Sequence, residues 1–250
     1  MTVLYKLIAV LILSVPSFFL SGKVIPYLSG RIEKELTELG EEFSPLKNPK
    51  KASVIFQIIL IFLYVITAIN SGDNLGFTDI IRFISIILLI YILSVISRLD
   101  MTYCIIPNGT NLIILIGSAI VSLAIPLLWG LQDGIFDTVV NCLIGFAVGG
   151  LSLFVINLIS RLVFKRDGVG GGDMKMMFGI GLLLGLKLTI FALLLSFILG
   201  AIIGVLLRVF SRSEDEMVEI PFGPYLALGS VTAALFGDSI INWYFGLLGL

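Results

Sequence analysis

The chain has 250 residues, of which 58% are hydrophobic and only 13% are charged, and its mean hydropathy is +1.12. Because soluble domains carry roughly 25% charged residues, this composition excludes an ordinary soluble fold and indicates an integral membrane protein. The 16 basic and 17 acidic residues nearly cancel and no basic module is visible, so a nucleic-acid partner is not expected.

Apolar runs of about 20 residues recur along the chain, and each can cross a hydrocarbon core of ~30 Å as a helix. This pattern predicts an all-α integral membrane protein with about eight transmembrane helices. The expected spans are 3–22, 53–70, 79–97, 110–129, 139–163, 174–186, 188–207 and 222–237. A very tight turn at 185–187 joins the sixth and seventh, whereas 238–250 is too short for a ninth. The first run lacks a small-residue cleavage site and is interpreted as a retained span.

The loop at 23–52 is the only sizeable soluble piece, and it divides the chain into regions 1–52 and 53–250. Within it, four apolar residues repeat at the spacing of one helix face: Ile32, Leu36, Leu39 and Phe43. This spacing predicts a short amphipathic helix at the membrane surface. Alternatively, the glutamates that surround this stripe attract a basic substrate segment.

Basic residues indicate the orientation of the spans. If the 23–52 loop is cytoplasmic, the loops around 98–109, 164–173 and 208–221 lie on the same side. Those loops and their helix ends hold most of the lysines and arginines, namely Lys23, Arg31, Lys34, Lys47, Lys50, Lys51, Arg98, Arg161, Lys165, Arg166, Lys175, Arg208 and Arg212. The opposite side keeps Lys6, Arg82 and Lys187. This bias predicts a multi-pass protein of the cell (inner) membrane with these loops in the cytoplasm.

Two aspartates lie at the cytoplasmic ends of predicted spans. Asp173 follows three glycines at the mouth of an apolar helix, and Asp100 occupies a similar boundary. An ionisable group there is costly and usually functional, although Asp173 alone would also suit a helix cap. The glycines permit unusual backbone dihedrals and close approach of another chain, but they lack the Gly-Lys-Ser/Thr ending of a phosphate-binding loop. Two carboxylates on the same face of the membrane, one with a glycine-rich approach, predict an acid–base site.

Three segments together resemble the type IV prepilin peptidases, a family of membrane aspartyl peptidases with a G-x-G-D motif. The resemblance covers about residues 53–245 in order and spacing. It is carried by Asp100 with Pro107 and Asn108, by Gly170, Gly171, Gly172 and Asp173 with Lys175, and by the Ile220–Ala227 sequence that contains Pro221, Gly223 and Pro224.

The resemblance implies that region 53–250 is a peptidase domain and that Asp100 and Asp173 are its catalytic pair. The other residues of the three segments would support the pair or bind substrate. Lys175 would tune the charge of the pair or grip a substrate carbonyl, or it would only snorkel to water. The implied partners are the lipid bilayer and a pilin-like precursor with a short basic leader and a hydrophobic helix, cleaved at the cytoplasmic boundary.

Many members of that family also methylate the new amino terminus from S-adenosylmethionine and carry paired C-x-x-C motifs between the first two spans. Here the loop is short and has no cysteine, which argues against methylation and leaves no cofactor expected. The only cysteines, Cys104 and Cys142, form no C-x-x-C pair, and histidine is absent, so no metal site is expected.

Three other functions remain open at this point. An archaeal-type preflagellin peptidase would share both aspartate motifs. A transporter or channel also uses intramembrane carboxylates and broken helices, although it would place ionisable groups near the midplane of the bilayer. A non-catalytic membrane scaffold could retain the fold.

Overall fold

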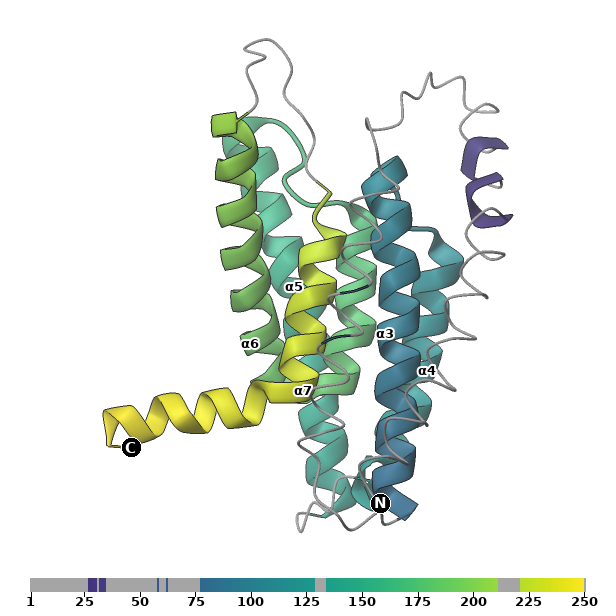
Figure 1. Cartoon of the computed structure of the whole chain (residues 1–250), viewed down its shortest axis with the longest axis vertical. Helices are drawn as coiled ribbons and strands as arrows, with labels where there is room; N and C mark the ends of the chain where they lie inside the picture. The colour runs from purple at the N-terminus through teal and green to yellow at the C-terminus, as the bar shows by residue number, and fades with distance from the viewer. Residues whose placement is uncertain are drawn as a thin grey trace.

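The computed structural model describes residues 27–30, 32–34, 58, 62, 77–128, 134–210 and 221–249 (Figure 1). Within these ranges all regular structure is helical and no strand is present, which confirms the predicted fold class for this part of the chain. The long helices are α3 (Phe77–Tyr103), α4 (Asn108–Leu128), α5 (Ile135–Phe164), α6 (Gly171–Phe210) and α7 (Gly223–Leu248). The expected spans 3–22 and 53–70 and the boundary at residue 52 lie outside the described residues, so about eight spans remains a prediction.

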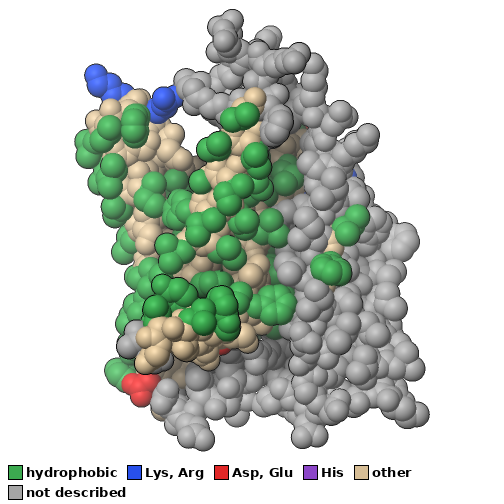
Figure 2. Space-filling model, turned by 60° about the vertical axis from the view of Figure 1, so that its left-hand side comes forward, with side chains coloured by type: hydrophobic (Ala, Val, Ile, Leu, Met, Phe, Trp, Pro, Cys, Tyr) green, Lys and Arg blue, Asp and Glu red, His purple; other side chains and the backbone are tan. Residues whose placement is uncertain are grey.

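The described helices form a membrane bundle. Three stretches are long and apolar enough to cross a bilayer, namely Phe136–Phe164, Gly171–Leu206 and Gly223–Leu248. Large apolar side chains point outward from α5, among them Leu151, Phe154, Leu158 and Leu162. Figure 2 shows hydrophobic side chains covering one face of the described helices, with charged side chains at its two ends. Such a surface requires lipid around it, because soluble monomers rarely expose apolar patches of this extent.

α6 consists of two helices joined by a sharp turn at Gly185. Gly185 has φ 70° and ψ −179°, a conformation that is essentially restricted to glycine. The Thr189 hydroxyl lies 3.4 Å from the Gly181 carbonyl oxygen, eight residues earlier. A straight helix would separate those positions by ~12 Å, so the chain folds back here. The turn predicted at 185–187 is confirmed.

Glycines bring α5 and the first half of α6 into backbone contact. A Cβ atom placed on Gly145 would lie 2.3 Å from the Gly181 carbonyl oxygen, and one on Gly149 would lie 2.4 Å from the Met177 carbonyl oxygen. Small residues at such positions are typical of helix pairs in lipid, where close van der Waals packing replaces the hydrophobic drive of water. This packing fixes the helix that begins with Asp173 against α5.

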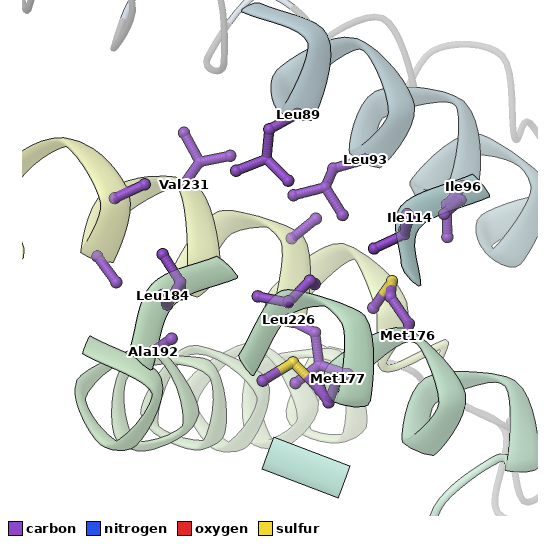
Figure 3. Packing of buried hydrophobic residues seen from close by; sticks show 14 of the residues in the cluster. Leu89, Leu93, Ile96, Ile114, Met176, Met177, Leu184, Ala192, Leu226 and Val231 are labelled. Atoms are coloured by element: carbon purple, nitrogen blue, oxygen red, sulfur yellow. The ribbon is translucent and has the colours of Figure 1, made fainter. Parts of the chain in front are cut away.

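The buried core lies between α3, α4, α6 and α7 (Figure 3). Leu93 of α3, Met177 of α6 and Leu226 of α7 are fully buried and lie together in it. α7 also packs tightly on the second half of α6, because a Cβ on Gly229 would lie 2.1 Å from the Ser196 hydroxyl oxygen. The last turn of α3, the start of α6 and the start of α7 therefore meet at one end of a single bundle (Figure 1).

The far end of α7 and the start of the 23–52 loop add detail that the predicted spans did not contain. α7 was expected to end at residue 237, but it continues to Leu248, and its last part leaves the bundle (Figure 1). This part exposes Trp243, Tyr244 and Phe245. At the other end of the bundle, Ile32 is buried against Leu99 and Tyr103 of α3. The start of the 23–52 loop thus packs near Asp100, whereas the rest of the predicted amphipathic helix lies outside the described residues.

Candidate active site

Asp100 lies in the last turn of α3 and is only 4% exposed. Its Oδ2 atom accepts a 2.8 Å hydrogen bond from the backbone N–H of Gly223, the first residue of α7. The first N–H groups of a helix have no partner within the helix and carry its positive dipole end, so they suit a carboxylate. Asp100 therefore receives its hydrogen bond from a segment 123 residues away in the chain.

Only glycine fits at position 223. A Cβ atom there would lie 2.7 Å from Oδ2 of Asp100 and 3.1 Å from its Cγ atom. The neighbouring prolines of this segment are also inside the bundle end, since Pro224 is buried and Pro221 is half-buried. The Pro-Phe-Gly-Pro sequence thus starts α7 directly against the carboxyl group of Asp100.

Asp173 is the third residue of α6 and is 5% exposed. The backbone of Gly170 hydrogen-bonds to its carboxylate, and a Cβ on Gly170 would lie 3.0 Å from Oδ2. Its Oδ1 atom is buried and has no hydrogen-bond partner within the described structure. Because buried polar atoms are almost always paired, this oxygen is available for a hydrogen bond with a group outside the described structure.

The two carboxylates interact with each other electrostatically. They come from different helices, and both lie where the loops between helices meet. Tyr225 is buried in the first turn of α7, and its side chain also interacts electrostatically with Asp100. Tyr225 belongs to the motif at the start of α7, but its residue type alone did not mark it as part of the site.

The segment between α3 and α4 crosses over the start of α6. α3 ends where Cys104 adopts a positive φ of 51°, and the Pro107 carbonyl accepts the first hydrogen bonds of α4, including one from the Thr110 hydroxyl. A Cβ on Gly172 would lie 2.7 Å from the Ile106 Cβ. This close approach explains why the residue immediately before Asp173 is a glycine.

Lys175 donates a 2.7 Å hydrogen bond from Nζ to Oδ1 of Asn108. This contact joins two residues that the sequence had assigned to separate motifs, the start of α4 and the start of α6. The Lys175 side chain is exposed. Gly171 is also exposed, and nothing lies within 4 Å of the position where its Cβ would be.

The sequence did not reveal two asparagines that hold the glycine loop. Asn111 of α4 donates from Nδ2 to the Gly172 carbonyl oxygen at 3.2 Å. Asn157 of α5 accepts from the Gly168 N–H at 2.8 Å. Asp167 in the same loop is exposed but paired, because the Arg161 guanidinium donates to it and lowers its pKa.

The described residues contain no group of three or more Asp, Glu and Cys side chains that could hold a metal ion.

Comparison with known proteins identifies the family. The model of the type IV leader peptidase family matches residues 87–205. A prepilin leader peptidase/N-methyltransferase of Bacillus subtilis is 31% identical over 188 residues, which are 75% of this chain and 67% of that protein. Proteins of the same name from Aeromonas hydrophila and Pseudomonas aeruginosa are 38% and 36% identical over 49% and 51% of this chain.

The chain matches less than half the length of the last two relatives, 43% and 45%. No solved structure matches the chain. The family match includes both aspartates and the glycine loop, and the Bacillus subtilis relative is covered over two thirds of its length. The chain is therefore a member of the type IV leader peptidase family.

Proposed function

We propose that this chain is a membrane aspartic endopeptidase in which Asp100 and Asp173 form the catalytic pair. The single observation that carries the proposal is that two buried carboxylates from α3 and α6 interact at the same end of the bundle. Two carboxylates in that position cannot both ionise cheaply, so they share one proton. A pair with one proton supplies a base and an acid at once.

The contacts of each carboxylate suggest which one acts as the base and which one acts as the acid. The N–H of Gly223 suits an ionised Asp100, whereas Oδ1 of Asp173 has no partner and is free to carry the shared proton. The ionised member removes a proton from water, and the water oxygen attacks the scissile carbonyl carbon. The protonated member donates a hydrogen bond to the carbonyl oxygen and then delivers its proton to the leaving nitrogen as the C–N bond breaks.

The proposed substrate is a pilin-like precursor with a short basic leader and an apolar helix. Three observations support it: the relatives are named prepilin leader peptidases, the carboxylates lie at one end of the bundle, and basic residues of the sequence favour the cytoplasm for that end. In this orientation the leader meets the pair at the inner boundary of the cell membrane. Region 53–250 would form the peptidase domain.

The names of the relatives also include N-methyltransferase. The proposal is restricted to leader cleavage, because the short cysteine-free loop at 23–52 departs from the family pattern on which methylation rests. Mass spectrometry of the amino terminus of a processed pilin tests this restriction, since a methylated terminus would contradict it.

Co-expression of the chain with a prepilin tests the catalytic pair. Asp100→Asn and Asp173→Asn should each abolish processing while the protein still inserts into the membrane. Asp238→Asn is the matched control, because Asp238 lies in the last part of α7 and is paired with Lys187. Normal processing by both active-site variants would refute the assignment, and vesicle flux assays on the same variants would then test transport.

A further inference from the structure

The loop that leads to Asp173 is held in place by one side chain of α5. Oδ1 of Asn157 accepts hydrogen bonds from the N–H groups of Gly168 at 2.8 Å and Val169 at 3.2 Å. Nδ2 of the same side chain donates to Oδ1 of Asp167 at 3.2 Å. The described contacts of this amide thus all go to three consecutive loop residues.

Asn157 is unusual for its place in the helix. It is 6% exposed, whereas the next two residues of the lipid-facing helix, Leu158 and Ile159, are largely exposed. An amide buried in an apolar helix is costly unless its hydrogen bonds are made. The loop makes those bonds, so Asn157 and the loop satisfy each other.

Other contacts fix the same stretch of chain. Val169 is buried in the main core cluster. A Cβ on Gly168 would lie 2.7 Å from the Ser160 side chain, and the Ser160 hydroxyl donates to the Arg166 carbonyl oxygen at 3.1 Å. The beginning of the loop is therefore attached to α5 over four residues, 166–169.

The far end of the loop is attached to α4. Nδ2 of Asn111 donates to the Gly172 carbonyl oxygen at 3.2 Å, immediately before Asp173. Oδ1 of Asn111 is buried without a partner, as is Oδ1 of Asp173. Between the two attachments, Gly170 and Gly171 are exposed.

We propose that Asn157 is a positioning residue for Asp173: it holds the backbone of Gly168 and Val169 and the side chain of Asp167, so that the glycines that follow deliver the Asp173 carboxylate to a defined place beside Asp100. Asn111 secures the opposite end of the same loop. Glycine has no side chain to restrict its own dihedrals. The conformation of the glycine loop must therefore be fixed by contacts with neighbouring residues. The inference rests on the proposed peptidase function for its effect on catalysis, but the attachment itself is independent of that function.

The chemistry requires an amide at position 157. The side chain must accept from two N–H groups and donate to a carboxylate at the same time, and asparagine has both an acceptor oxygen and a donor nitrogen. Aspartate keeps the acceptor but places a second carboxylate against Asp167. Alanine removes all three hydrogen bonds.

Asn141 provides a matched control on the same helix. Its Oδ1 atom accepts a 3.1 Å hydrogen bond from the Leu186 N–H at the turn of α6. It therefore also holds a turn through a backbone N–H, but at the end of the bundle away from Asp173. A purely structural role would lower kcat only in proportion to the loss of folded protein, whereas a positioning role lowers kcat in N157A protein that remains folded.

The kinetic test uses the full-length protein in detergent and a synthetic precursor peptide with a basic leader and an apolar segment. N157A should lower kcat about 10- to 100-fold with KM within about twofold, because a displaced catalytic group loses turnover more than ground-state binding. N141A should keep kcat within about twofold. N157D should also be impaired, because it loses the donor nitrogen and places a second carboxylate against Asp167. Wild-type kcat in N157A would overturn the inference.

Hydrogen exchange gives a readout that does not depend on peptidase activity. N157A should accelerate exchange of the amides of Gly168 and Val169, whereas D173N should leave them protected. Unchanged protection in N157A would overturn the inference even if D173N abolishes cleavage. If the wild-type protein cleaves no precursor while N157A still exposes these amides, the peptidase function fails and the attachment stands.

Discussion

The contact between Asp100 and α7 predicts the outcome of Gly223→Ala. The new methyl carbon would lie 2.7 Å from Oδ2 of Asp100, so the carboxyl must retreat by at least about 0.7 Å to reach ordinary van der Waals contact, which begins near 3.4 Å. That movement lengthens the 2.8 Å hydrogen bond from the Gly223 N–H and weakens it. A hydrogen bond to a charged group contributes about 1.5–3 kcal/mol, which corresponds to a fall in kcat/KM of about 10- to 100-fold.

The assay measures kcat/KM on a precursor peptide and the free energy of unfolding in detergent for the same variants. Gly246→Ala is the control, because it changes a glycine of the same helix where nothing lies within 4 Å. Overpacking at Gly223 should destabilise the fold by about 1–3 kcal/mol. In the D100A background, G223A should cost much less, because the carboxyl atoms that the methyl meets are gone. An active G223A, or an equal loss of stability in both backgrounds, would refute this geometry.

Three further predictions concern the turn of α6, an ion pair and the glycine loop. Gly185→Ala should destabilise the fold by about 1–3 kcal/mol, because φ 70° with ψ −179° excludes a side chain, and denaturant titration in detergent would show it. Removing the 2.8 Å ion pair between Lys187 and Asp238 should change stability by less than about 1 kcal/mol in the same titration, because both side chains are more than half exposed. The pKa of Asp167 is lowered by Arg161, so its contribution to loop stability is present above the ordinary aspartate pKa of about 3.9 and is lost only as the pH falls below it. Hydrogen exchange of the loop, corrected for intrinsic rates, should therefore be constant from neutral pH to about pH 4, and a loss of protection near neutrality would contradict this.

The described helices could be predicted from the sequence because lipid imposes a simple length rule. A span must be apolar for about 20 residues, and α3, α4, α5 and the two halves of α6 each contain one predicted run. The end of a helix was harder to predict where the helix continues past its apolar run. α7 continues past residue 237 to Leu248, and its last part leaves the bundle (Figure 1).

The members of the site were predictable only where a motif marked them. Asp100, Asp173 and the glycines were identified from ordered motifs, and their position at one end of the bundle agrees with that identification. Their catalytic roles stay a prediction. Asn157 and Asn111 gave no signal, because one asparagine in an apolar helix has no periodicity to distinguish a loop anchor from a solvated residue. Their partners become visible only when α4, α5 and α6 are packed together.

The surroundings of the two carboxylates differ because their backbone hydrogen bonds come from different parts of the chain. Asp100 ends a helix and receives its N–H from the start of another helix, so its environment depends on the packing of α3 against α7. Asp173 begins a helix and receives its nearest backbone contact from its own glycine loop. A disturbance of α7 should therefore act first on Asp100, and a disturbance of α5 should act first on Asp173. If the two carboxylates share one proton as proposed, a displacement of either one lowers turnover. G223A and N157A should therefore both lower kcat, although one acts through α7 and the other through α5.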